Sequence, residues 1–125
     1  MTPDLRTLVE RLKAVSHPLR LRTLALLASG ELCVCQVAEV LEVPMSSASE
    51  ALRELRRAGF VAERREGRWV YVSVAPAEAD SSLLQGLVEE ARRLPEAEAD
   101  LRRAQEVRAL DIPVVCSRVQ KAARA

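Results

Sequence analysis

Apolar residues recur every three or four positions along the first part of the chain, and this spacing predicts a series of short helices. One helix is expected over residues 4–15. A second follows, with Ser16 as its N-cap and Gly30 at its end. A third is expected over 33–42, and Pro44 ends it because proline disfavours helical backbone in the residue before it.

A fourth helix and a β-hairpin are expected next. The helix covers residues 46–58, where Ser47 and Glu50 match a capping box. The pattern then changes to an alternation of valine with larger or polar side chains, which is typical of strands. We expect strands at 60–65 and 68–74, joined by a tight turn.

The helical pattern returns after the hairpin. One helix stops before Pro95, and a second, highly charged helix is expected over 96–110. Pro113 ends the helical pattern, and we expect a short tail that carries Cys116.

This order of elements predicts a mainly α fold with a β-hairpin wing, the winged helix-turn-helix. A short helix, a tight turn and a second helix with a polar face form the helix-turn-helix, and the hairpin directly after it is the wing. The length of 125 residues corresponds to one folded unit. Within it, we place the winged helix-turn-helix and its dimerisation helices in residues 1–94, and a C-terminal helix and tail in 95–125.

The composition is that of an ordinary globular protein, with 49% hydrophobic and 30% charged residues. No run of about 18 apolar residues is present, so we expect no membrane span. The first residues lack the apolar core of a signal peptide, so we expect the protein in the cytoplasm. There the three cysteines are expected to be reduced thiols rather than a disulfide framework.

Charge is unevenly distributed, although the net charge is only +1. Residues 43–74 carry six arginines against four glutamates, a charge of +2, whereas residues 75–112 carry five arginines against nine acidic residues, a charge of −4. The more basic segment holds the fourth helix and the hairpin, which are the parts of this fold that contact DNA. The candidate DNA-binding residues are Ser46, Ser47, Ser49, Glu50, Arg53, Arg56, Arg57, Arg64, Arg65 and Arg68.

These side chains could also form a solvated surface without a partner. Glu50 has two interpretations, because it could accept a hydrogen bond from a cytosine amino group or cap the fourth helix. In a two-fold dimer, two such helices would lie about one DNA turn apart, roughly 34–36 Å. Double-stranded operator DNA is therefore the expected partner.

Two cysteines, Cys33 and Cys35, stand two positions apart in residues 31–36. On a regular helix their side chains would point about 200° apart, whereas in an extended segment they share a face. Binding of one soft ion to both therefore requires the start of the third helix to fray or unwind, which would move the fourth helix. Cys116 could add a third thiolate, in a pyramidal site suited to trivalent arsenic or antimony, or pack as a small apolar residue.

Three segments together resemble the ArsR–SmtB family of winged-helix repressors. Residues 16–21 resemble the start of its second helix, residues 31–36 the cysteine box of its arsenic-sensing branch, and residues 46–71 its recognition helix and wing. The resemblance implies a homodimer, formed by the first and fifth helices, that represses a resistance operon. It also implies that Cys33 and Cys35 bind arsenite or antimonite as the inducer, and that no other cofactor is required.

The chain departs from the family pattern at two places. Gln36 and Val37 stand where the family often has an aspartate and a third cysteine, so the third ligand is Cys116, an external thiol, or missing. Glu50 and Ala51 stand where many members carry histidine or arginine, which leaves the operator sequence open. The histidine and acidic ligands that zinc sensors carry on the last helix are missing, so we expect no zinc sensing at that second site.

Other functions remain open at this point. The same fold could sense cadmium or lead, or it could sense thiol oxidation or persulfide through Cys33 and Cys35. A dimerisation module that does not bind DNA is a further alternative. A thiol redox enzyme is a remote one, because the sequence has no C-x-x-C motif and no glycine-rich phosphate loop, so we expect that the protein is not an enzyme.

Overall fold

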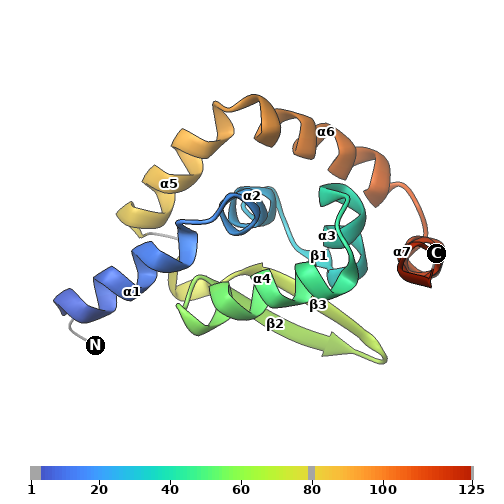
Figure 1. Cartoon of the computed structure of the whole chain (residues 1–125), viewed down its shortest axis with the longest axis horizontal. Coiled ribbons are helices and arrows are strands. Elements are labelled where there is room, and N and C mark those ends of the chain that lie inside the picture. The colour runs from blue at the N-terminus through green and yellow to red at the C-terminus, as the bar shows by residue number, and fades with distance from the viewer. Residues whose placement is uncertain (1–3, 79–80, 125) are drawn as a thin grey trace.

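The computed structural model describes residues 4–78 and 81–124, and for residues 122–124 it describes the backbone alone. Figure 1 shows a helical molecule with a small sheet on one side. Its elements, in chain order, are α1 (Leu5–Val15), α2 (Pro18–Leu27), β1 (Leu32–Cys33), α3 (Val34–Leu41), α4 (Met45–Arg57), β2 (Val61–Glu66), β3 (Trp69–Val74), a 3-10 turn η1 (Pro76–Glu78), α5 (Ser82–Arg92), α6 (Pro95–Arg108) and α7 (Ile112–Arg124). Among the described residues, no helix is both long and apolar enough to span a membrane.

The predicted winged helix-turn-helix is confirmed. Helices α3 and α4 are joined by a short turn that starts at Glu42, which has a left-handed backbone with φ 56°. Strands β2 and β3 form the antiparallel wing, and Gly67, with φ 60°, lies in its turn. The prediction missed β1, which pairs with β3 and makes the sheet three-stranded in the order β1-β3-β2. A strand of two residues is too short to show an alternating pattern in the sequence.

Two predicted helix starts are wrong. Helix α2 is capped by His17 rather than Ser16, because the His17 Nδ1 atom accepts a hydrogen bond from the Leu19 N–H at 3.2 Å. Helix α4 begins at Met45, after Pro44 with its extended backbone, so the capping box of Ser47 and Glu50 does not form. The fixed φ of proline sets the start of α4 without a side-chain cap.

The core lies between α2, α3, α4 and the sheet. Its largest fully buried side chains include Leu24 of α2, Val37 of α3, Leu55 of α4, Val72 of β3, and Phe60, which directly precedes β2. Because these helices pack on a shared core, the relative positions of α3, α4 and the wing are fixed by burial of apolar surface.

The C-terminal part of the chain also differs from the prediction. Residues expected as a short tail form helix α7, and Pro113 is its second residue rather than the end of a helix. Proline is tolerated there because the first N–H groups of a helix have no partner within the helix. In Figure 1, α5 and α6 form an arc around α2, and α7 lies beside α3.

Charged side chains attach this arc to the helix-turn-helix. Asp100 of α6 is only 3% exposed and accepts two hydrogen bonds from Arg22 of α2, at 2.8 and 3.0 Å. Arg103 of α6 donates to the carbonyl oxygens of Glu39 and Val40, both at 2.9 Å. These carbonyls belong to the last turn of α3, where a helix leaves carbonyl groups without a full set of partners. The Glu39 carbonyl also accepts a hydrogen bond from the Glu42 N–H at 3.3 Å. The C-terminal helices are therefore held directly against the segment that carries two of the cysteines.

Candidate functional site

The structure brings all three cysteines together. Cys33 lies in β1, Cys35 in the first turn of α3, and Cys116 in α7. Their sulfur atoms all lie within 4.8 Å of one another, and all three residues are buried. Cys35 and Cys116 form a disulfide with a Cα–Cα distance of 5.1 Å, whereas Cys33 is a free thiol.

Two expectations about these cysteines are wrong in this structure. The thiols are not all reduced, since Cys35 and Cys116 are bonded to each other. The start of α3 also need not unwind for Cys33 and Cys35 to lie close together. Cys33 already has an extended backbone, with φ −71° and ψ 150°, and only Cys35 lies in the helix, so the opposed helical directions do not arise.

Gln36 and the sheet position Cys33. The buried Gln36 side chain accepts a hydrogen bond from the Cys33 N–H at 2.8 Å, which caps the N-terminus of α3. Cys33 also pairs with Tyr71 of the wing in the antiparallel ladder between β1 and β3. The sequence signal for this role of Gln36 was its place three residues after Cys33, the spacing of a capping box with cysteine as the N-cap.

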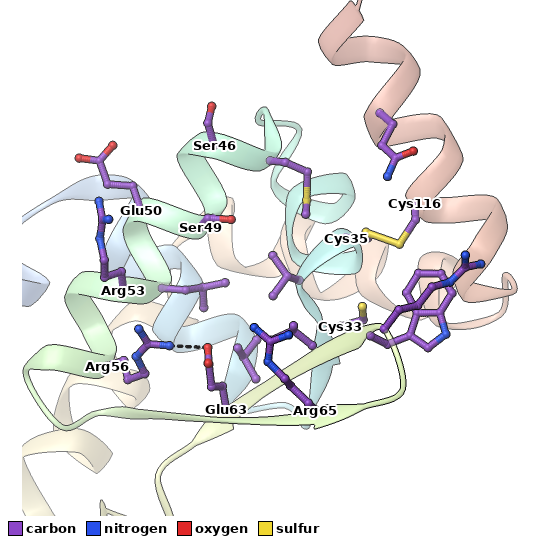
Figure 2. A pocket seen from close by; sticks show the side chains of 18 of the residues that line it. Cys33, Cys35, Ser46, Ser49, Glu50, Arg53, Arg56, Glu63, Arg65 and Cys116 are labelled. Carbon is purple, nitrogen blue, oxygen red and sulfur yellow. Dashed lines mark ion pairs between the residues drawn. A yellow bond between two sulfur atoms is a disulfide. The ribbon is translucent and has the colours of Figure 1, made fainter.

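The cysteines lie at one end of a cleft of about 950 Å³ between α4, the wing and α7. Figure 2 shows Cys33, Cys35 and Cys116 on one side of this cleft, with α4 and the wing strand that carries Arg65 on the others. The predicted DNA-binding residues that line it are Ser46, Ser49, Glu50, Arg53, Arg56, Arg65 and Arg68. The same cleft thus joins the sulfur atoms and most of the candidate DNA surface.

The other three predicted DNA-binding residues lie outside this lining. Ser47 is half-buried in the first turn of α4, and Arg57 forms an ion pair with Glu54 on its own helix at 3.4 Å. Arg64 donates to both oxygens of Glu31, at 2.7 and 2.9 Å, and stacks 4.4 Å from the centre of the Tyr71 ring. Arg64 therefore links the wing to the segment just before Cys33.

The charges on α4 and the wing are partly compensated by acidic neighbours. The hydrogen bonds from Arg64 hold the pKa of Glu31 below its ordinary value. Arg56 forms an ion pair with Glu63 across the space between α4 and β2 (Figure 2). Arg53 and Arg65 also line the cleft and are exposed, so their charges can face a polyanion.

Known protein sequences resemble the part of the chain that holds Cys33, Cys35 and the helix-turn-helix. A sequence model of the family described as "Bacterial regulatory protein, arsR family" matches residues 17–63. The arsenic resistance transcriptional regulator ArsR1 of Pseudomonas putida is 38% identical over 69 residues, which are 54% of this chain and 54% of that protein. The cadmium resistance regulatory protein CadC homolog of Staphylococcus aureus is 39% identical over 80 residues, 63% of this chain and 62% of that protein. The alignment with such curated relatives thus spans about half to two-thirds of their length.

The matches with solved structures cover about three quarters of this chain and 90% or more of the solved chain. Reduced HlyU from Vibrio cholerae has a TM-score of 0.61 and 31% identity, and the match covers 72% of this chain and 90% of HlyU. A homodimeric winged helix-turn-helix DNA-binding domain from Mycobacterium bovis has a TM-score of 0.62 and 28% identity, with 75% of this chain and 94% of that domain covered. These proteins are transcriptional regulators rather than enzymes. From the cysteine segment, the winged helix-turn-helix and these likenesses, we conclude that the chain belongs to the ArsR family of bacterial regulatory proteins.

Proposed function

We propose that this protein is a transcriptional repressor that binds operator DNA as a homodimer and is released from it in the presence of arsenite or antimonite, which bind Cys33, Cys35 and Cys116. The observation that carries the proposal is the cluster of three sulfur atoms within 4.8 Å of one another at the edge of the cleft lined by α4 and the wing. A repressor of this kind acts in the cytoplasm, where bacterial DNA is found.

The DNA-binding part of the proposal is supported by the exposed face of α4. Ser46, Ser49 and Arg53 point away from the core, and Arg65 and Arg68 extend from the wing. In this arrangement α4 occupies the major groove, and the arginines contact phosphates beside it. The relatives whose names state DNA binding or transcriptional regulation share this part of the chain.

The dimer is supported by an unpartnered apolar face on α1. Leu5 is 78% exposed, and Leu8, Val9 and Leu12 are between 38% and 42% exposed. Four large apolar side chains on one helix face are costly to leave in water, and a second copy of the chain would cover them. The homodimeric Mycobacterium bovis domain has the same fold.

The inducer is supported by the chemistry of the donor set. Thiolates select soft ions, and three of them suit the pyramidal geometry of trivalent arsenic or antimony. Arsenous acid and three thiols give one arsenic tris-thiolate and three waters, without oxidation or reduction. The Cys35–Cys116 disulfide must first accept two electrons and two protons from cellular thiols. Among the described residues, the cluster that could hold a metal consists of these three cysteines, with no histidine or carboxylate. Three ligands are fewer than we expect for a cadmium or lead site.

Fluorescence anisotropy on DNA from upstream of the gene tests this proposal. The reduced wild-type protein should bind this DNA and lose it as arsenite is added. Cys33→Ser should bind DNA with unchanged affinity and resist release, because only two sulfur atoms remain. Normal release of Cys33→Ser would refute the three-thiolate site, and no binding of the DNA by the wild type would refute the repressor.

A second candidate signal is thiol oxidation, because the structure contains a disulfide between Cys35 and Cys116. The same assay separates the two signals. An oxidant such as diamide would release DNA from Cys33→Ser but not from Cys116→Ser if the disulfide is the signal. Arsenite would release it from neither variant. Release of the wild type by arsenite alone would assign the cluster to the metalloid.

A further inference from the structure

We infer that the inducer and DNA share one entrance, so that bound DNA closes the route to the cysteines and arsenite loads only the free repressor. This inference rests on the proposed function and adds the order in which the two ligands act. Its starting point is that Cys33, Cys35 and Cys116 line the same cleft as the candidate DNA-binding residues.

The far side of the cysteine cluster is closed by the core. Leu32 and Val37, which flank the two cysteines along the chain, are 1% and 0% exposed. Val115, next to Cys116 on α7, is 0% exposed. Core interiors are close-packed, so an ion does not reach the sulfur atoms from this side without local unfolding. The cleft is therefore the direct route.

The lining of the cleft includes groups suited to a DNA backbone, beside the acidic Glu50 and Glu63. Ser46, Ser49 and Arg53 come from α4, and Arg65 and Arg68 from the wing. Pro113, Ser117 and Gln120 of α7 form the remaining wall, beside Cys116. A cleft of about 950 Å³ has the size of a small-molecule site. It admits arsenite but not a duplex, and a duplex lying on these rim residues covers its opening.

This arrangement determines the kinetics of release. Arsenite does not displace DNA from the complex. The complex dissociates at its own rate, and arsenite then captures the free protein and prevents rebinding. The release rate therefore reaches a plateau as arsenite increases, and that plateau equals the intrinsic dissociation rate.

Stopped-flow anisotropy measures this rate. A complex of reduced protein with labelled DNA is mixed either with excess unlabelled DNA or with arsenite at increasing concentration. We expect the same limiting rate in both experiments. A rate that rises with arsenite above the rate measured with unlabelled DNA would overturn the inference, because it would require arsenite to enter the complex.

Protection of Cys33 from alkylation is an independent readout. With DNA at about ten times its Kd, roughly a tenth of the protein is free, so modification of Cys33 by N-ethylmaleimide should slow about tenfold. Salt that dissociates the complex should restore the rate. Ser82→Cys introduces a matched control thiol at an exposed position on α5, away from the cleft, and its modification should not change.

The two proposals fail in different ways. If DNA binds but Cys33 is modified at the same rate with and without it, the shared entrance is wrong and the repressor remains. If the protein does not bind DNA, the anisotropy itself shows that the proposed function is wrong. The stopped-flow result stands whether or not Cys33 reacts with the alkylating reagent.

Discussion

The Cys35–Cys116 disulfide should make the oxidised protein much harder to unfold than the reduced protein. The bond joins residues that are 81 positions apart in the sequence. Closing a loop of this length lowers the entropy of the unfolded chain, which raises the free energy of unfolding by about 4.5 kcal/mol at room temperature. This is a large share of the total stability of a small domain, which is about 5–15 kcal/mol.

Urea unfolding of the oxidised and the reduced protein, followed by circular dichroism, measures this difference. With a slope of about 2 kcal/mol per molar urea, reduction should lower the unfolding midpoint by about 2 M. Cys33→Ser is the matched control, because it keeps the disulfide and should keep the shift. Cys116→Ser should abolish it.

Two results would refute this reasoning. A difference below about 1 kcal/mol between the oxidised and reduced wild type would show that loop closure does not determine the effect. An undiminished shift in Cys116→Ser would show that the redox-sensitive group lies elsewhere.

Three further predictions concern charged side chains. Arg22→Met leaves the buried Asp100 carboxylate unpaired and should lower the free energy of unfolding by about 3 kcal/mol. Urea titration measures this change, and a loss below about 1 kcal/mol would contradict a stabilising role of the buried ion pair. Arg53→Ala should weaken DNA binding and reduce the slope of log affinity against log salt by about one. Arg64→Ala should reduce this slope less, because Arg64 is already paired with Glu31, and equal slopes for the two variants would contradict this. The pKa of Glu31 lies below its ordinary value of 4.5, so its contribution to stability is present above that pH and is lost as the pH falls through the lower value of the folded state. In acid, wild-type protein should therefore lose a small part of its free energy of unfolding, below about 1 kcal/mol for this exposed ion pair, and Glu31→Gln should not show this loss. Identical plots of unfolding free energy against pH for the two proteins would refute the prediction.

The winged helix-turn-helix could be predicted because its signals are local. Apolar spacing identified the helices around residues 5–57, and alternation identified the hairpin strands. The likeness of residues 31–36 to the family's cysteine box pointed to Cys33 and Cys35, again a local signal, but it did not reveal that the extended backbone of Cys33 brings the two thiols together. Helix starts were less predictable, because Pro44 and His17 replaced the expected caps.

The features that the sequence did not reveal depend on contacts between distant segments. Strand β1 exists because Leu32 and Cys33 pair with the wing about 40 positions later. Arg64 looked like a phosphate ligand, but its partner Glu31 is 33 positions away. Neither partner leaves a periodic signal in its own neighbourhood.

The sequence by itself determined helices α1 to α6, the hairpin, and the gathering of basic residues on α4 and the wing. Only the tertiary structure decided that Cys116 joins the other two cysteines, because that requires α7 to be a helix and to pack on α3, with α6 held by Arg22 and Arg103. Local periodicity reports which face of an element is apolar, but not which distant element covers it. That choice depends on the combined burial and ion pairing of the whole chain, which must outweigh the entropy of closing a loop 81 positions long.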